Sequence, residues 1–460
     1  MALGGIAERH STHRRVFQNA AVVGVLTSLV KVAAAAKVIV TARYFGAGDE
    51  LDAFLIAFLL PTFVVETVAA TFTVSLVPRL IHARTHESAA AAIELAQAGL
   101  ALVLAVMAVL TVALALGARP LLLMMGSSFS GPKLDLTVAL FLSMLVWLPM
   151  AACSATWRAV LNAHGLVALS TAVFMAPPAI TMLLLMVGGT QWGVWALAWS
   201  NTAGVALEFA VLAVAVRRLG YPLRLRWTCW TPEIRAIRDQ YWPILAGTSI
   251  TAGCGLVDQA VAGALGSGSV SALSYGVKVG GVLVAVGGTG MATAVLPEFS
   301  RLVSENRWDA LRHAMRVHTG AAMAVMVPVT ALVMWSSTAV VRLLYQGGQF
   351  DEAATILVAE VQRYSLMVVP FGVVLLIAQR LATAVGLSGM ILRAGFLGML
   401  VNIAGDLLLP RWMGVAGIAL ASTLAHVVFT SVLLILLYRK EPRLFRSVTR
   451  KHACAAQPLG

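Results

Sequence analysis

The chain has 460 residues, of which 60% are hydrophobic and 12% are charged, and its mean hydropathy is +0.88. Soluble domains carry about 25% charged residues, so this composition excludes a soluble globular protein and indicates a polytopic membrane protein. The formal net charge of +13 would suit nucleic-acid binding. The basic residues, however, fall in alternate loops between apolar segments, as the positive-inside rule requires, so we expect no nucleic-acid partner.

Apolar segments predict an all-α fold of about twelve membrane-spanning helices. Residues 1–16 are polar and basic and no small-residue cleavage site follows, so we expect the first span to stay in the protein. An odd number of spans would destroy the alternation of basic loops, so both termini are expected in the cytoplasm. The predicted spans are 17–42, 52–80, 91–116, 136–160, 166–188, 193–216, 241–264, 270–298, 317–345, 353–379, 388–410 and 414–438.

The first predicted span carries two lysines, Lys31 and Lys37, well inside its apolar sequence. A lysine near the middle of a lipid-exposed helix costs about 2.5–3.5 kcal/mol. We therefore expect both to face a protein interior or a watery cavity, where their charge favours an anion. Six residues place them about 120° apart on a helix, so they share a face only if the helix bends. The alternative is that one or both reach a membrane interface.

Short motifs repeat in the same order in the two halves of the chain. FGAG at 45–48 is similar to LGSG at 265–268, and GVWALA at 193–198 is similar to GVAGIA at 414–419. Each half holds six spans, so the pattern predicts two six-helix lobes related by a parallel repeat, an architecture typical of transporters. The expected division is an N-terminal lobe at 1–216, a basic cytoplasmic linker at 217–240, a C-terminal lobe at 241–438 and a basic cytoplasmic tail at 439–460.

Two further groups of polar residues lie inside predicted spans. Lys278 is in span eight, the repeat counterpart of span two, and we expect it to line the same cavity as the first-span lysines, where three cations suit a diphosphate. Its alternative role is to pair with a buried carboxylate such as Glu66. Oxygen-bearing side chains form the second group, which suits a small hard cation or acts as polar glue between helices: Asp258 in span seven, Asn402 and Asp406 in span eleven, and Ser422 in span twelve.

The segments 45–81, 268–302 and 343–350 resemble signature sequences of the MurJ/MviN flippase family, and the similarity runs from about residue 20 to 438. This resemblance implies that Lys31, Lys37 and Lys278 replace three cavity arginines, and that Asp52 matches an acidic residue of the cavity. It also implies a sodium site, which is the one cofactor expected. Its ligands would be Asp258, Asn402, Asp406, the Ile418 carbonyl and Ser422. The sequence differs from the family at Val38, Val65 and Glu66, and we expect no further helices after span twelve.

The resemblance implies alternating-access flipping of undecaprenyl-diphosphate-linked saccharides, lipid II or a related glycan, across the bacterial inner membrane. Membrane lipids would surround the chain, and cell-wall or polysaccharide synthesis enzymes are candidate partners. One alternative is a flippase for the lipid-linked repeat units of an exopolysaccharide, and a second is a cation-coupled exporter of small amphipathic molecules. A cationic cavity argues against cationic drugs as the cargo of such an exporter. Another alternative is a scaffold without transport, which would have no need of intramembrane charges. Neither a catalytic constellation nor a GxxxxGK[ST] nucleotide motif is present in the sequence, so we expect a transporter and not an enzyme. The scattered cysteines indicate neither zinc nor disulfides.

Overall fold

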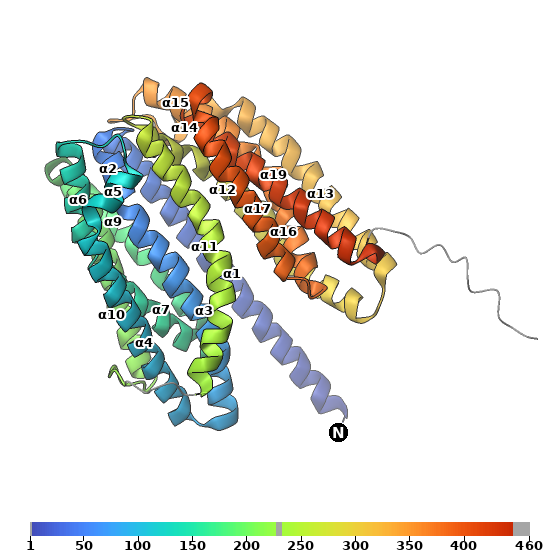
Figure 1. Ribbon diagram of the computed structural model, residues 1–460. Coiled ribbons are helices and arrows are strands. Elements are labelled where there is room, and N and C mark those ends of the chain that lie inside the picture. The colour runs from blue at the N-terminus through green and yellow to red at the C-terminus, as the bar shows by residue number, and fades with distance from the viewer. Residues whose placement is uncertain (1, 227–231, 445–460) are drawn as a thin grey trace, which may run out of the picture. The chain divides into compact units, whose positions relative to one another are not determined.

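A computed structural model describes residues 2–226 and 232–444, and within them the chain is helical (Figure 1). The linker residues 227–231 and the tail from 445 onward, parts of two predicted segments, lie outside the described residues. Twelve of the described helical segments are long and apolar enough to cross a membrane, which confirms the predicted all-α polytopic fold. Because a spanning helix satisfies its backbone hydrogen bonds internally, it is one of the few structures that a bilayer tolerates.

Contacts group the helices into two units. Unit 1 comprises residues 1–272 and 341–355, and unit 2 comprises residues 273–340 and 356–460. The helices of unit 1 are α1 (Ala2–Phe45), α2 (Asp49–Val64), α3 (Ala70–His82), α4 (Ala89–Leu116), α5 (Ala118–Met125), α6 (Pro132–Met144), α7 (Trp147–Ala163), α8 (Val167–Ala172), α9 (Ala176–Trp192), α10 (Trp195–Arg218) and α11 (Pro232–Ala264).

Helix α12 (Ser269–Ser304) begins in unit 1 and continues in unit 2, as its residue range shows. The boundaries between the units also fall inside α14 (Ser337–Tyr345) and α15 (Glu352–Leu366). The remaining elements of unit 2 are α13 (Trp308–Trp335), α16 (Val368–Ala384), α17 (Gly389–Leu408), α18 (Pro410–Met413), α19 (Val415–Lys440) and the short 3₁₀ turn η4 (Pro442–Leu444).

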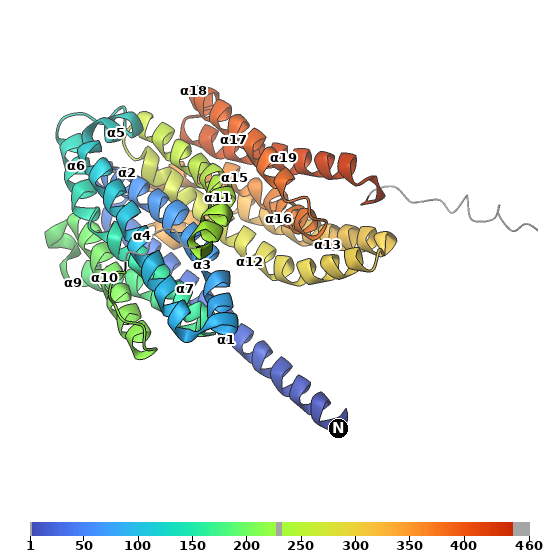
Figure 2. The same cartoon turned by 60° about the horizontal axis from the view of Figure 1, so that its bottom comes forward.

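The core of unit 1 is built from α2, α3, α4, α6 and α7, which pack against one another (Figure 2). Large side chains such as Leu76, Met107 and Phe141 are fully buried there. Helix α11 packs against α2 and α3, where the hydroxyls of Thr248 and Thr71 lie 3.1 Å apart. Contacts therefore group α11 with the N-terminal helices, whereas the repeat predicts that 241–438 forms the second lobe. That lobe boundary stays a prediction.

The core of unit 2 lies between α12, α13, α16 and α19, around Phe299, Leu311, Val373 and Leu433. Helices α17 and α19 run side by side in both views. They approach closely because of small residues: a Cβ added to Gly405 would lie 2.7 Å from the Ala421 Cβ. This helix pair positions one group of the predicted site residues.

The second and ninth predicted spans differ from the structure in their limits for reasons that the helices show. The second membrane segment runs without a break through Asp49–Glu87, and π-helical turns at Val65–Ala69 and Ala83–Glu87 widen it locally. The ninth span is Trp308–Trp335, whereas hydropathy predicted 317–345. The helix ends at Ser336, and the apolar sequence that follows forms the separate helix α14. Hydropathy does not detect such a break because apolar residues continue across it.

Candidate functional site

Helix α1 carries Lys31 and Lys37 within the membrane segment Val22–Phe45. The Lys31 side chain is exposed and Lys37 is half-buried. Helix α1 packs against α8 and α9, so part of its surface is covered by the N-terminal bundle. An ammonium group exposed to lipid in mid-span would be costly.

Lys278 lies on the exposed face of α12 in unit 2. The opposite face of this helix packs closely against α15: a Cβ at Gly276 would lie 2.6 Å from Val361, and one at Gly280 would lie 3.4 Å from the Ser365 carbonyl oxygen. The Ser365 hydroxyl also donates to the Gly276 carbonyl at 3.0 Å. Since Lys278 is two residues from each glycine, it points about 160° away from the packed face. The glycines therefore determine which way the cation points.

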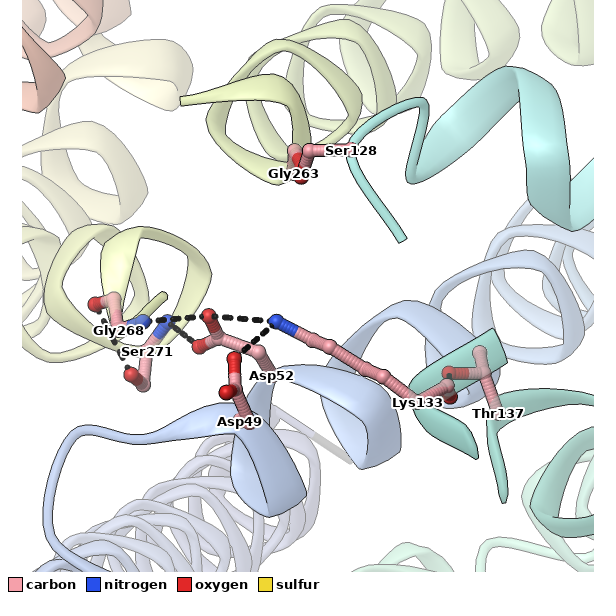
Figure 3. Close-up of polar contacts among 8 residues, drawn as sticks. All are labelled: Asp49, Asp52, Ser128, Lys133, Thr137, Gly263, Gly268 and Ser271. Atoms are coloured by element: carbon pink, nitrogen blue, oxygen red, sulfur yellow. Dashed lines mark hydrogen bonds and ion pairs between the residues drawn. The ribbon is translucent and has the colours of Figure 1, made fainter. Parts of the chain in front are cut away.

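Asp52 lies in α2 and is fully buried, and its carboxylate caps the start of α12 (Figure 3). One carboxylate oxygen accepts the Gly268 N–H and the other accepts the Ser271 N–H, both at 2.8 Å. The Ser271 hydroxyl donates to the Gly268 carbonyl at 3.0 Å, which closes the turn. The first N–H groups of a helix lack intrahelical acceptors, and the helix dipole favours negative charge beside them. The Asp52 carboxylate supplies both the hydrogen-bond acceptors and the negative charge.

This geometry differs from the expectation that Asp52 lines a diphosphate cavity. Its side chain has no exposed surface, and each oxygen is engaged by a backbone donor. A negative carboxylate would also repel a diphosphate. In this conformation Asp52 holds the N-terminus of the helix that carries Lys278.

Lys133, at the start of α6, is a residue that the sequence analysis missed. Its ammonium lies between two carboxylates of α2: it donates to Asp49 and is 3.8 Å from Asp52 (Figure 3). It also lies 3.9 Å from the centre of the Phe129 ring. Lys133 and its partner Asp49 are 84 positions apart in the sequence. A local sequence pattern cannot predict a contact between residues so far apart.

Four of the five residues predicted to bind sodium lie on the packed pair α17 and α19. Asn402 and Asp406 are each 1% exposed, and Ile418 is fully buried. The Asn402 amide donates to the Ser422 hydroxyl at 3.4 Å. Asp258 lies on α11 in unit 1 and is half-buried. The carboxylate, amide, hydroxyl and carbonyl oxygens on α17 and α19 are hard ligands, a type of donor that suits a hard cation.

The sequence is similar to proteins of one transporter family. The sequence profile described as lipid II flippase MurJ matches residues 41–456. A lipid II flippase MurJ homologue of Rhizobium tropici is 24% identical over 323 residues, which cover 68% of this chain and 60% of the relative's length. A Bdellovibrio bacteriovorus homologue is 23% identical over 416 residues, which cover 87% of this chain and 78% of that protein.

Solved structures share the fold at low identity. The structure of lipid II flippase MurJ in an inward closed conformation matches with a TM-score of 0.77 and 16% identity, covering 90% of this chain and 87% of that one. An inward-facing multidrug transporter of the MATE family matches with a TM-score of 0.78 and 13% identity, covering 91% and 96%. The fold alone does not separate the two families, but the sequence profile does: the chain belongs to the lipid II flippase MurJ family.

Proposed function

We propose that this protein flips an undecaprenyl-diphosphate-linked saccharide, lipid II or a related glycan, across the bacterial inner membrane. The observation that carries the proposal is the family match over residues 41–456. The lysines inside the helices that are long and apolar enough to cross a membrane support it, since the resemblance implies that they replace the family's cavity cations. The protein is accordingly a transporter, and it acts by alternating access.

The three lysines bind the diphosphate of the carrier lipid in this proposal. Lys31 and Lys278 have exposed side chains at membrane depth, and each carries a point charge with three donors. A diphosphate offers several anionic oxygens, so binding offsets the cost of keeping these ammonium groups away from bulk water. The prenyl chain remains in lipid, and the saccharide follows the diphosphate through the protein.

Both termini face the cytoplasm in the proposed orientation. The basic residues of 217–226 and of 439–443 then lie on the cytoplasmic side, and the start of α6, which carries Lys133, lies on the periplasmic side. Asp52 serves as a positioning residue for α12 at that periplasmic end.

A sodium ion is the proposed coupling or stabilising ligand. Asn402, Asp406, Ser422 and the Ile418 carbonyl would hold it from α17 and α19, and Asp258 would be the further ligand that the family resemblance supplies. Asn402 and Asp406 are almost fully buried. A bound cation or a proton would offset the free-energy cost of burying the Asp406 carboxylate in a membrane protein.

A flipping assay in proteoliposomes tests the function. Purified protein is reconstituted, and the transfer of lipid II, of an undecaprenyl-diphosphate-linked oligosaccharide of different composition, and of a cationic drug is measured in parallel. We expect transfer of at least one lipid-linked saccharide and not of the drug. Drug export without lipid transfer would replace the proposal with the multidrug-exporter alternative.

A further inference from the structure

A cavity of about 350 Å³ lies at one end of unit 2, where α13 begins and α19 ends. Three arginines line it: Arg307 and Arg312 come from the start of α13, and Arg443 comes from η4. The lining also includes Trp308 and Asp309. None of the residues proposed above for transport or for sodium lines this cavity.

The cavity meets the uncapped N-terminus of a long helix. Helix α12 ends in a tight turn in which the Arg307 N–H bonds to the Leu302 carbonyl at 2.9 Å and Asn306 adopts a left-handed conformation with φ 53°. Helix α13 then begins at Trp308, with Arg307 as its N-cap and without a side chain that caps it. The first-turn N–H groups are therefore available to an anion, which the helix dipole also favours.

Arg312 gives a second, independent indication of an anionic ligand. The residue is only 8% exposed, and it lines the cavity. One terminal nitrogen donates to Asp309, but the buried Nε–H has no acceptor within the described residues. A buried guanidinium N–H without a partner is unfavourable, and an anionic oxygen in the cavity would supply the missing acceptor.

Arg443, a third arginine of the lining, is held in place by neighbouring side chains. The Arg443 guanidinium stacks 4.4 Å from the Trp308 ring and donates two hydrogen bonds to the Glu441 carboxylate, at 2.6 and 3.1 Å. Arg307 forms an ion pair with Glu305. Neither Glu305 nor Glu441 lines the cavity. Asp309 is the acidic residue of the lining, and its side chain is 88% exposed. The lining therefore carries three positive charges against one well-solvated negative charge.

We infer that this cavity binds a phosphate group, and that the headgroup of an anionic phospholipid supplies it. Arginine forks and helix N-termini both suit phosphate oxygens. The lipid is favoured as the source because α13 and α19 are both long and apolar enough to span a membrane, and the cavity lies where α13 begins and α19 ends, a position that suits the level of the headgroups. Trp308 is a side chain typical of that interface.

Lipid binding to the full-length protein tests the inference. Delipidated protein in detergent is titrated with dioctanoyl phosphatidylglycerol, dioctanoyl phosphatidylcholine or potassium phosphate, with potassium chloride as the salt control. Bound lipid is counted by native mass spectrometry, and thermal stability is measured in parallel. The variants are Arg312→Gln and Arg443→Gln. The matched control is Arg316→Gln, which removes an exposed arginine one turn further along α13 and outside the lining.

We expect phosphatidylglycerol to bind at least about fivefold more tightly than phosphatidylcholine, and each lining variant to weaken that binding about tenfold. The Arg316 control should stay within about twofold of the parent. Arg443 is largely exposed, so its variant should fold even if the loss of Arg312 destabilises the protein. Binding that is equal in all variants, or absent for both phosphatidylglycerol and phosphate, would overturn the inference. Arginine-dependent binding of potassium phosphate as tight as that of the lipid would retain the phosphate site and remove the lipid as its source.

Discussion

The carboxylate of Asp52 in α2 accepts the backbone N–H of Ser271 in α12 at 2.8 Å, across 219 positions of sequence. It accepts the Gly268 N–H at the same distance with its other oxygen. The start of α12 is therefore attached to α2 by one side chain that is buried completely. Helix α12 also carries Lys278, so the contact links an acidic residue of the first half to the orientation of a proposed substrate-binding helix.

Replacing Asp52 should reduce stability first and transport second. Asp52→Ala removes both acceptors and leaves two buried N–H groups unsatisfied, at a cost of about 1–3 kcal/mol. Asp52→Asn keeps one acceptor and should cost less. Thermal unfolding of the purified variants measures the effect. An Asp52→Ala protein with an unchanged melting temperature and no flipping would instead place this carboxylate in direct contact with the ligand.

Lys133 should matter more than an ordinary surface cation. Its side chain is 18% exposed and lies between Asp49 and the fully buried Asp52. Lys133→Met leaves a buried carboxylate without its nearest cation, so the melting temperature should fall clearly. The control is Arg119→Met, because Arg119 and Asp135 form a pair at 3.5 Å whose side chains are 66% and 64% exposed. Such exposed pairs contribute about 0–1 kcal/mol. Equal melting temperatures of the two variants would contradict this prediction.

The sequence predicted the number of spans because hydropathy and the distribution of basic residues are each local signals that the bilayer imposes. The sequence predicted that Asn402 and Asp406 share one face of a helix, because residues four positions apart do so on any α-helix. In α17 both side chains are buried. The sequence did not predict the ion pairs of Lys133 or the hydrogen bonds of Asp52 to the start of α12, because both depend on contacts between distant segments. The burial of Asp52 follows from the turn at Gly268, whose added Cβ would lie 2.9 Å from the Ala47 carbonyl oxygen.

The intramembrane lysines should be required for flipping. Lys31→Ala, Lys37→Ala and Lys278→Ala should each reduce lipid transfer about tenfold or more while membrane insertion is unchanged, because each removes a charged donor from the proposed diphosphate contact. Arginine at the same positions should restore part of the activity, since the charge is kept. Lys440→Ala, at the exposed end of α19, is the control. Normal transfer in all three alanine variants would remove the anion-binding interpretation.

Membrane orientation is tested by reporter fusions. A reporter fused after residue 225 or after residue 445 should read as cytoplasmic, and one inserted within 120–132 should read as periplasmic. The physical reason is the concentration of arginines near the first two positions. Inverted readings at all three sites would reverse the proposed direction of the protein and place Lys133 in the cytoplasm.

Sodium should stabilise the protein to heat more than potassium does. The proposed ligands Asn402, Asp406 and Ser422 lie on two helices that are packed together by small residues, so the ion would strengthen an interface that already exists. A ligand that binds the folded protein raises its stability with concentration. Asp406→Asn or Asp258→Asn should abolish the sodium increment and reduce flipping, whereas Lys31→Ala should leave the increment unchanged, because that lysine is not among the proposed ligands. Melting curves in sodium chloride and potassium chloride at equal ionic strength provide the measurement. Stabilisation that is the same in both salts, and the same in the aspartate variants, would leave these residues as polar contacts between helices.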